Sequence, residues 1–93
     1  MRLSDKEIEI IKRTVMEYFG NSRVYLFGSR LIDQKRGGDI DLFVIPDVKD
    51  SLYLRKIKTK AKLKQLLKKP VDLVVHRDFE RKLEQEALAG VEL

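Results

Sequence analysis

The chain has 93 residues, contains no cysteine and carries a formal net charge of +5. This length predicts one domain, residues 1–93, with a thin core that buries roughly 60–65% of the unfolded surface. The cysteine count excludes a disulfide framework and a thiolate metal site. No apolar stretch is long enough to span a membrane, and the charged start MRLSDKEIEI lacks a signal-peptide centre, so we expect a soluble, cytoplasmic protein.

The first half of the chain is expected to form a helix and two strands. Residues 4–19 are predicted to be helical, because Ser4 and Glu7 have the spacing of a capping box and apolar residues recur on one face. Strands are predicted over residues 23–27 and 39–45, which are rich in β-branched and aromatic residues. Beyond its first residues the second strand is apolar on both faces, as in the centre of a sheet.

The second half is expected to continue as helix, strand and helix. A long helix from about residue 51 to 68 should end before Pro70, and its expected buried face comprises Tyr53, Leu54, Ile57, Ala61 and Leu67. The stretch VDLVV, residues 71–75, reads as a third strand, and the final VEL as the beginning of a short edge strand. A last helix capped by Asp78 should turn three residues inward: Phe79, Leu83 and Ala87. The fold class is therefore α/β or α+β, with a small mixed sheet and helices packed on it.

Two acids stand at the start of the central strand. Asp39 and Asp41 are two residues apart, so in a strand they project from the same side with Cα atoms roughly 6.5–7 Å apart. Like charges placed together repel, and two carboxylates at this spacing can bind a pair of Mg²⁺ ions. Asp72, inside the apolar strand VDLVV, can complete a cluster of three carboxylates if its strand lies beside the second. The alternative is a turn residue, a strand cap and an ion pair between Asp72 and a lysine such as Lys35.

Gly28 and Ser29 directly follow the first strand. A glycine lets backbone N–H groups approach a phosphate, and the serine hydroxyl can bind phosphate oxygens. The alternative is an ordinary turn. The segment is not a Walker loop, because it lacks the required glycine and lysine spacing.

The segments LFGSR, GGDIDLFV and VDLVV occur in an order that resembles the minimal nucleotidyltransferases of the DNA polymerase β-like superfamily. The resemblance covers nearly the whole chain and implies the polymerase β-like nucleotidyltransferase fold. The sequence departs from the family pattern in two ways. Nine residues separate Ser29 from Asp39, one fewer than the commonest spacing, and Gly38 stands where the family often has serine.

The resemblance also implies roles for residues. Gly28 and Ser29 would hold the β- and γ-phosphates of a nucleoside triphosphate, and Arg30 and Gly38 would belong to the same nucleotide site. Three acids would be catalytic and bind two Mg²⁺ ions: Asp39, Asp41 and Asp72. Asp72 would also help to deprotonate the attacking hydroxyl. The reaction implied is transfer of a nucleoside monophosphate with release of pyrophosphate.

Residues 51–69 contain eight cations and no acid, so the rest of the chain has a net charge of −3, which is +5 minus 8. A solvated helix surface explains this charge, and an acidic partner or an RNA backbone is the functional alternative. His76 is the single histidine, and with no cysteine it cannot form a His-based metal site on its own. We interpret His76 as a loop residue.

Three hypotheses about function follow. The first is an enzyme that transfers AMP from ATP to a protein hydroxyl. The family resemblance implies an antitoxin that modifies a tyrosine of a cognate HEPN-domain toxin. A homo-oligomer and a hetero-oligomer are both compatible with this role. The second is an antitoxin that neutralises such a toxin by binding alone. The third is an RNA-binding accessory domain that uses the basic helix.

Overall fold

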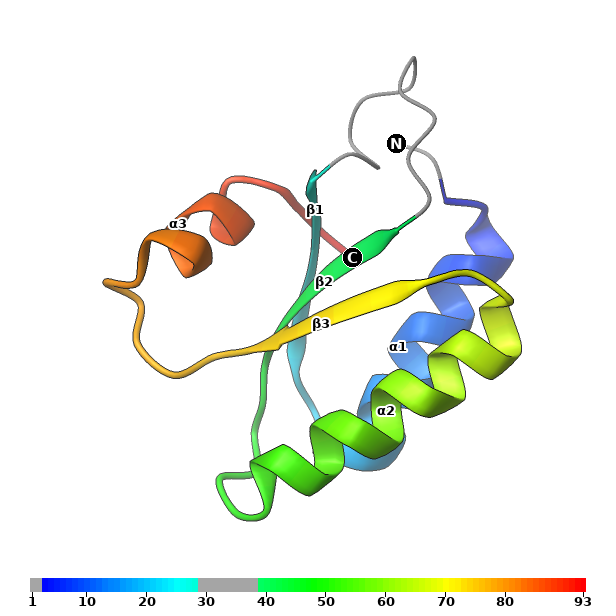
Figure 1. Cartoon of the computed structure of the whole chain (residues 1–93), viewed down its shortest axis with the longest axis horizontal. Coiled ribbons are helices and arrows are strands. Elements are labelled where there is room, and N and C mark those ends of the chain that lie inside the picture. The colour runs from blue at the N-terminus through cyan, green and yellow to red at the C-terminus, as the bar shows by residue number, and fades with distance from the viewer. Residues whose placement is uncertain (1–2, 29–38) are drawn as a thin grey trace.

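A computed structural model describes residues 3–28 and 39–93. Its centre is a four-stranded sheet formed by β1 (Arg23–Phe27), β2 (Ile40–Ile45), β3 (Val71–Val75) and β4 (Val91–Glu92). The strand order is β3-β2-β1-β4 (Figure 1). β1 pairs antiparallel with β2 and with β4, whereas β2 and β3 are parallel. The predicted mixed sheet, with β2 in its interior, is confirmed.

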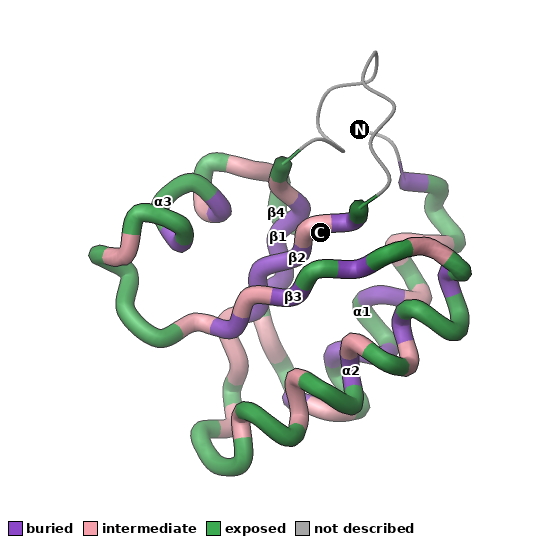
Figure 2. The backbone as a smooth tube through the Cα atoms, in the orientation of Figure 1, coloured by how far each residue is buried: buried purple, intermediate pink, exposed green. Residues whose placement is uncertain are grey.

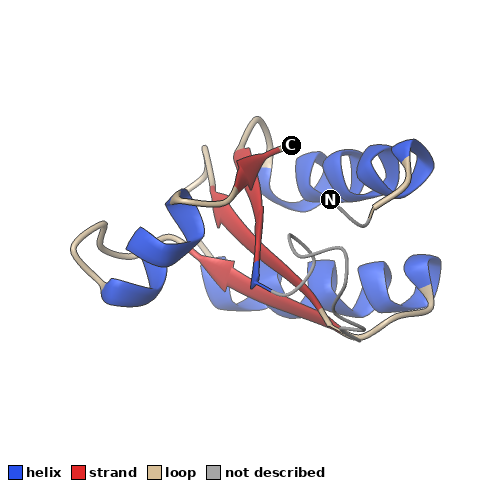
Figure 3. Ribbon diagram, turned by 90° about the horizontal axis from the view of Figure 1, so that it is seen from above, coloured by secondary structure: helices blue, strands red, loops and turns tan. Residues whose placement is uncertain are grey.

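Three helices cover the two faces of this sheet. α1 (Asp5–Phe19) and α2 (Leu52–Leu67) lie together on one face, and α3 (Lys82–Leu88) lies on the other (Figures 1 and 3). The larger core, between the α1–α2 layer and the sheet, contains the alternate strand residues Ile40, Leu42 and Val44. The smaller core joins Tyr25 and Phe43 to Ala87 of α3. Figure 2 shows buried residues along the central strands and on the helix faces that pack against them.

α1 begins as its sequence predicts. The Ser4 hydroxyl oxygen accepts a hydrogen bond from the Glu7 backbone N–H at 3.1 Å, and the Glu7 carboxylate accepts one from the Ser4 N–H at 3.0 Å. This reciprocal pair satisfies two N–H groups that a helix start leaves unbonded. Ile11, Val15 and Phe19 are buried on the face that packs against the sheet.

The predicted buried face of α2 is wrong except for Leu67. Tyr53, Leu54 and Ile57 are exposed, and the buried residues are Thr59, Leu63 and Leu67. The helix is therefore rotated about its axis relative to the prediction. Its apolar residues are spread around the whole circumference, so their spacing alone does not select one face.

This rotation turns several α2 cations toward α1. Lys62 pairs with Glu17 of α1 at 3.2 Å, and Lys69, just beyond the helix, pairs with Glu7 at 2.7 Å. Their aliphatic stems can cover apolar surface while the ammonium groups reach the acids. Part of the basic segment thus joins two helices and is not free surface charge.

The last helix differs from the prediction in its start and its buried face. Arg81, and not Asp78, is the N-cap residue of α3. Phe79 precedes the helix and is exposed, as is Leu83, while Glu84 and Ala87 are buried. In the described part of the chain, no helix has the length and apolar character needed to cross a membrane.

Candidate functional site

Two of the three predicted acids stand side by side in the sheet. In the pairing register, Asp41 of β2 lies opposite Asp72 of β3 and, on its other side, opposite Phe27 of β1. Asp39 precedes Asp41 by two residues and so leans toward the same face. This is the face that carries Phe43, Val74 and α3, away from the α1–α2 layer. The condition stated for a carboxylate cluster, adjacency of the two strands, is confirmed.

Asp72 is not the buried acid that its apolar neighbours suggested. β3 is an edge strand, and the Asp72 side chain is 59% exposed, because α3 covers β1 and β2 and does not extend over this end of β3. Lys60 of α2 places its Nζ 3.8 Å from the Asp72 carboxylate. An ion pair with a lysine does exist, as the alternative reading held, but its partner among the described residues is Lys60; Lys35 lies outside them.

The electrostatic state of Asp41 reflects this crowding. Burial raises the pKa of the Asp41 carboxyl, and the negative charges of Asp72 and Asp39 raise it further. Both effects disfavour the ionised form. A divalent cation bound to these carboxylates would relieve the repulsion, so the donor set fits a hard metal ion such as Mg²⁺.

Gly28 is shaped by the same acid. Its φ is +78°, a backbone conformation that residues with a side chain rarely adopt. A Cβ at this position would collide with Asp41 Oδ2 and stand 3.1 Å from Asp41 Cγ. Glycine is thus required for two reasons, the backbone angle and the close approach of the carboxylate. The other predicted nucleotide-binding residues, Ser29, Arg30 and Gly38, lie outside the described residues.

The acids do not form a closed cage by themselves. Within residues 3–28 and 39–93, no group of three or more His, Cys, Asp or Glu side chains is close enough to hold a metal ion. Mg²⁺ does not need such a cage, because it usually keeps waters and takes one or two carboxylates together with substrate phosphates. The geometry therefore fits a cation held jointly by the protein and a phosphorylated substrate.

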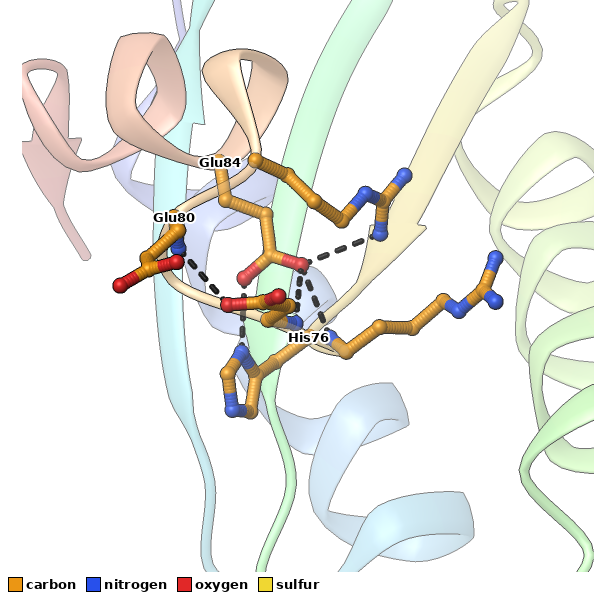
Figure 4. A network of polar contacts seen from close by, with 6 residues as sticks. His76, Glu80 and Glu84 are labelled. Carbon is orange, nitrogen blue, oxygen red and sulfur yellow. Dashed lines mark hydrogen bonds and ion pairs between the residues drawn. The ribbon is translucent and has the colours of Figure 1, made fainter.

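A second polar cluster, which the sequence analysis missed, surrounds Glu84 (Figure 4). The Glu84 side chain is fully buried. One carboxylate oxygen lies 2.7 Å from His76 Nδ1, and the other accepts hydrogen bonds from the backbone N–H groups of Arg77 and Asp78 and from Arg81 Nη1. His76 is more than a loop residue, since it also stacks on the Phe79 ring at 3.9 Å.

The Glu84 cluster holds the connection between β3 and α3 in one conformation. Burial by itself would raise the pKa of Glu84, but hydrogen bonds from His76, Asp78 N–H and Arg77 N–H outweigh it and hold the pKa below its usual range. A buried carboxylate with several donors is costly to leave unpaired. One signal was present in the sequence: Glu84 is three residues before Ala87, on the same helical face.

A comparison with known families finds a match over most of the chain. The family described as "Polymerase beta, Nucleotidyltransferase" matches residues 9–93, which include both acid-bearing strands. The three helices and four-stranded mixed sheet agree with that fold. A search of curated proteins finds no match.

Proposed function

The chain belongs to the polymerase beta nucleotidyltransferase family, and from that premise we propose that it transfers AMP from ATP to a hydroxyl of another protein, with Mg²⁺ bound at Asp39, Asp41 and Asp72. The observation that carries the proposal is the pairing of Asp41 with Asp72 across two parallel strands. These two adjacent strand acids repel each other, and this repulsion together with burial raises the pKa of Asp41. They fit the binding of metal and triphosphate.

The reaction forms one bond and breaks one. The acceptor hydroxyl oxygen bonds to the α-phosphorus of the nucleotide, the bond from that phosphorus to the bridging oxygen breaks, and pyrophosphate leaves. When bound at the carboxylates, Mg²⁺ supplies neutralisation of phosphate charge. Asp72 is the exposed acid and can accept the hydroxyl proton. Gly28 leaves its backbone open where a side chain would displace Asp41.

A protein acceptor is supported by the shape of the site. Asp39, just before β2, and Asp72, on the edge strand β3, are both exposed, so a large substrate can reach them. The family resemblance extends this proposal to a tyrosine of a HEPN-domain toxin and to a role as antitoxin. RNA as the partner is less favoured, because Arg55, Lys60, Lys62 and Lys69 of the basic segment already contact protein groups.

The test combines a transfer assay with a binding assay. The protein is incubated with α-labelled ATP, Mg²⁺ and the product of the adjacent gene, and the intact mass of each protein is measured. We expect the acceptor to gain the mass of AMP units, and Asp41→Asn to abolish the gain. Asp47→Asn is the matched control, because Asp47 is an exposed acid after β2 that does not belong to the acid row, which comprises Asp39, Asp41 and Asp72.

Two results would overturn parts of the proposal. If Asp41→Asn transfers label at the wild-type rate, Asp41 has no part in the reaction. If the acceptor binds tightly but gains no mass with any nucleotide, the protein acts by occupying its partner. Binding of Mn²⁺, followed by its effect on water relaxation, gives a readout independent of transfer and should weaken in Asp41→Asn alone.

A further inference from the structure

We propose that a hollow at the C-terminal end of β3 docks an acidic segment of a partner protein through one apolar side chain and flanking carboxylates. The hollow has a volume of about 430 Å³ and lies between the first turns of α2, the end of β3 and the start of α3. Its lining combines apolar and cationic residues: Leu52, Tyr53, Lys56, Val74, Val75, His76, Arg77, Arg81 and Leu83. None of these residues is an acid.

The hollow is positively charged, and part of this charge is not neutralised by carboxylates of the described residues. Arg81 is paired with the buried Glu84. Within the described residues, Lys56 and Arg77 have no carboxylate within 4.0 Å. They differ in this from Lys62, which pairs with Glu17 of α1. Charge complementarity therefore selects a ligand that carries carboxylates.

The apolar part of the hollow continues onto open surface. Tyr53 is 76% exposed and Leu83 is 41% exposed, although both line the hollow. Ile57, one helical turn after Tyr53 on α2, is also exposed. Contiguous exposed apolar residues rimmed by charges are typical of protein interaction sites. An apolar anchor side chain in the hollow would bury this surface.

The walls are organised before any partner binds. The four interactions of the Glu84 carboxylate fix His76, Arg81 and the backbone N–H groups between them (Figure 4). A surface that is already ordered loses less entropy on binding. The Glu84 carboxylate therefore orders one wall of the hollow in addition to joining β3 to α3.

The position of the hollow links it to the acid row, and in this respect the inference rests on the proposed function. Val74 follows Asp72 by two residues, so both lie on one face of β3 roughly 6.5–7 Å apart. Lys56 precedes Lys60, the partner of Asp72, by one helical turn. A segment docked in the hollow would therefore lie along the edge of β3, next to the carboxylates, where an acceptor hydroxyl is needed.

The test uses amide NMR of the full chain without nucleotide or metal. The probe is a short peptide in which leucines recur at helical spacing and glutamates flank each leucine. A matched peptide with serine for leucine and an oligouridylate serve as comparisons. We expect the leucine peptide to shift the amides of Lys56, Val74, Arg77 and Leu83, and to bind about tenfold more tightly than the serine peptide.

Two charge reversals on the same helix provide the matched variants. Lys56→Glu removes a cation from the hollow, whereas Lys58→Glu removes an exposed cation outside it. Both change the net charge equally. We expect Lys56→Glu to weaken peptide binding about fivefold relative to Lys58→Glu, as for loss of a partly exposed ion pair.

Each alternative outcome overturns the inference. Equal weakening by the two variants would show general attraction to the basic helix, and a preference for oligouridylate would identify a nucleic-acid surface. The same amide shifts appearing on concentration of the protein alone would assign the hollow to a second copy of this chain. Absence of peptide shifts at the hollow would refute docking there, even if transfer of AMP is intact. The supporting outcome is docking that persists in Asp41→Asn while transfer is lost, because it shows docking to be independent of the transfer site.

Discussion

Replacing Asp41 by asparagine should stabilise the metal-free protein at neutral pH. Asp41 and Asp72 are register partners on adjacent strands, so their charges are about 5 Å apart. Two unit charges at that distance repel by about 0.8 kcal/mol in a water-like medium. That medium is appropriate because Asp72 is exposed. Relief of this repulsion corresponds to a rise in Tm of about 3–6 °C for a domain of this size.

The pH dependence gives this prediction its sign. Burial, then the charges of Asp72 and Asp39, raise the pKa of Asp41 in the folded state above its ordinary value of 3.8. Wild-type stability is therefore favoured by protonation below that value and decreases as pH rises through the raised pKa. The advantage of Asp41→Asn should be absent at pH values below the ordinary pKa and complete above the raised one.

Thermal unfolding followed by circular dichroism, across a pH series, measures the effect. Added Mg²⁺ should raise the Tm of the wild type more than that of Asp41→Asn, because only the wild type regains a counter-charge. Asp47→Asn controls for the loss of one negative charge. A lower Tm for Asp41→Asn at neutral pH would refute the repulsion argument, as would a gain that persists unchanged in acid.

The remaining predictions concern Gly28, Glu84 and Lys60. Gly28→Ala should destabilise the protein more than Gly20→Ala, because both glycines have positive φ but only at position 28 would a Cβ press against Asp41. Urea unfolding of the two variants measures the difference in stability, and equal losses would contradict the contact. Glu84→Gln should cost about 2–4 kcal/mol at neutral pH. Because the folded-state pKa of Glu84 is lowered, the stability that its carboxylate contributes is present above the ordinary pKa of 4.5 and is lost on acidification. The urea unfolding curves of variant and wild type should therefore converge in acid. A difference in stability that stays constant with pH would contradict this. Lys60→Gln should lower the Mg²⁺ concentration needed to raise Tm, because it removes a competing cation, while changing stability by less than about 1 kcal/mol; an unchanged Mg²⁺ midpoint would show that Lys60 does not compete.

Local sequence determined the start of α1 and the existence of the strands. The Ser4–Glu7 capping box needs only residues within one turn, and it forms as predicted. Likewise β2 is apolar on both faces after Asp41, which is typical of a strand in the interior of a sheet. The order of the segments LFGSR, GGDIDLFV and VDLVV was also enough to predict the polymerase β-like nucleotidyltransferase family, which the comparison confirms.

Only the tertiary structure decided which acids meet and which helix faces are buried. The parallel pairing of β2 with β3 brings Asp41 opposite Asp72, although the chain separates them by a whole helix. α2 has apolar residues around its circumference, so packing against α1 and β3, and not periodicity, selected Leu63 over Ile57 for the core. Glu84 became a buried residue because His76 and the backbone N–H groups before α3 converge on it. The pairing of Asp41 with Asp72 and the choice of the buried α2 face depend on contacts between segments distant in sequence. The burial of Glu84 depends on how the chain turns between β3 and α3. The spacing of residues along the chain does not predict either.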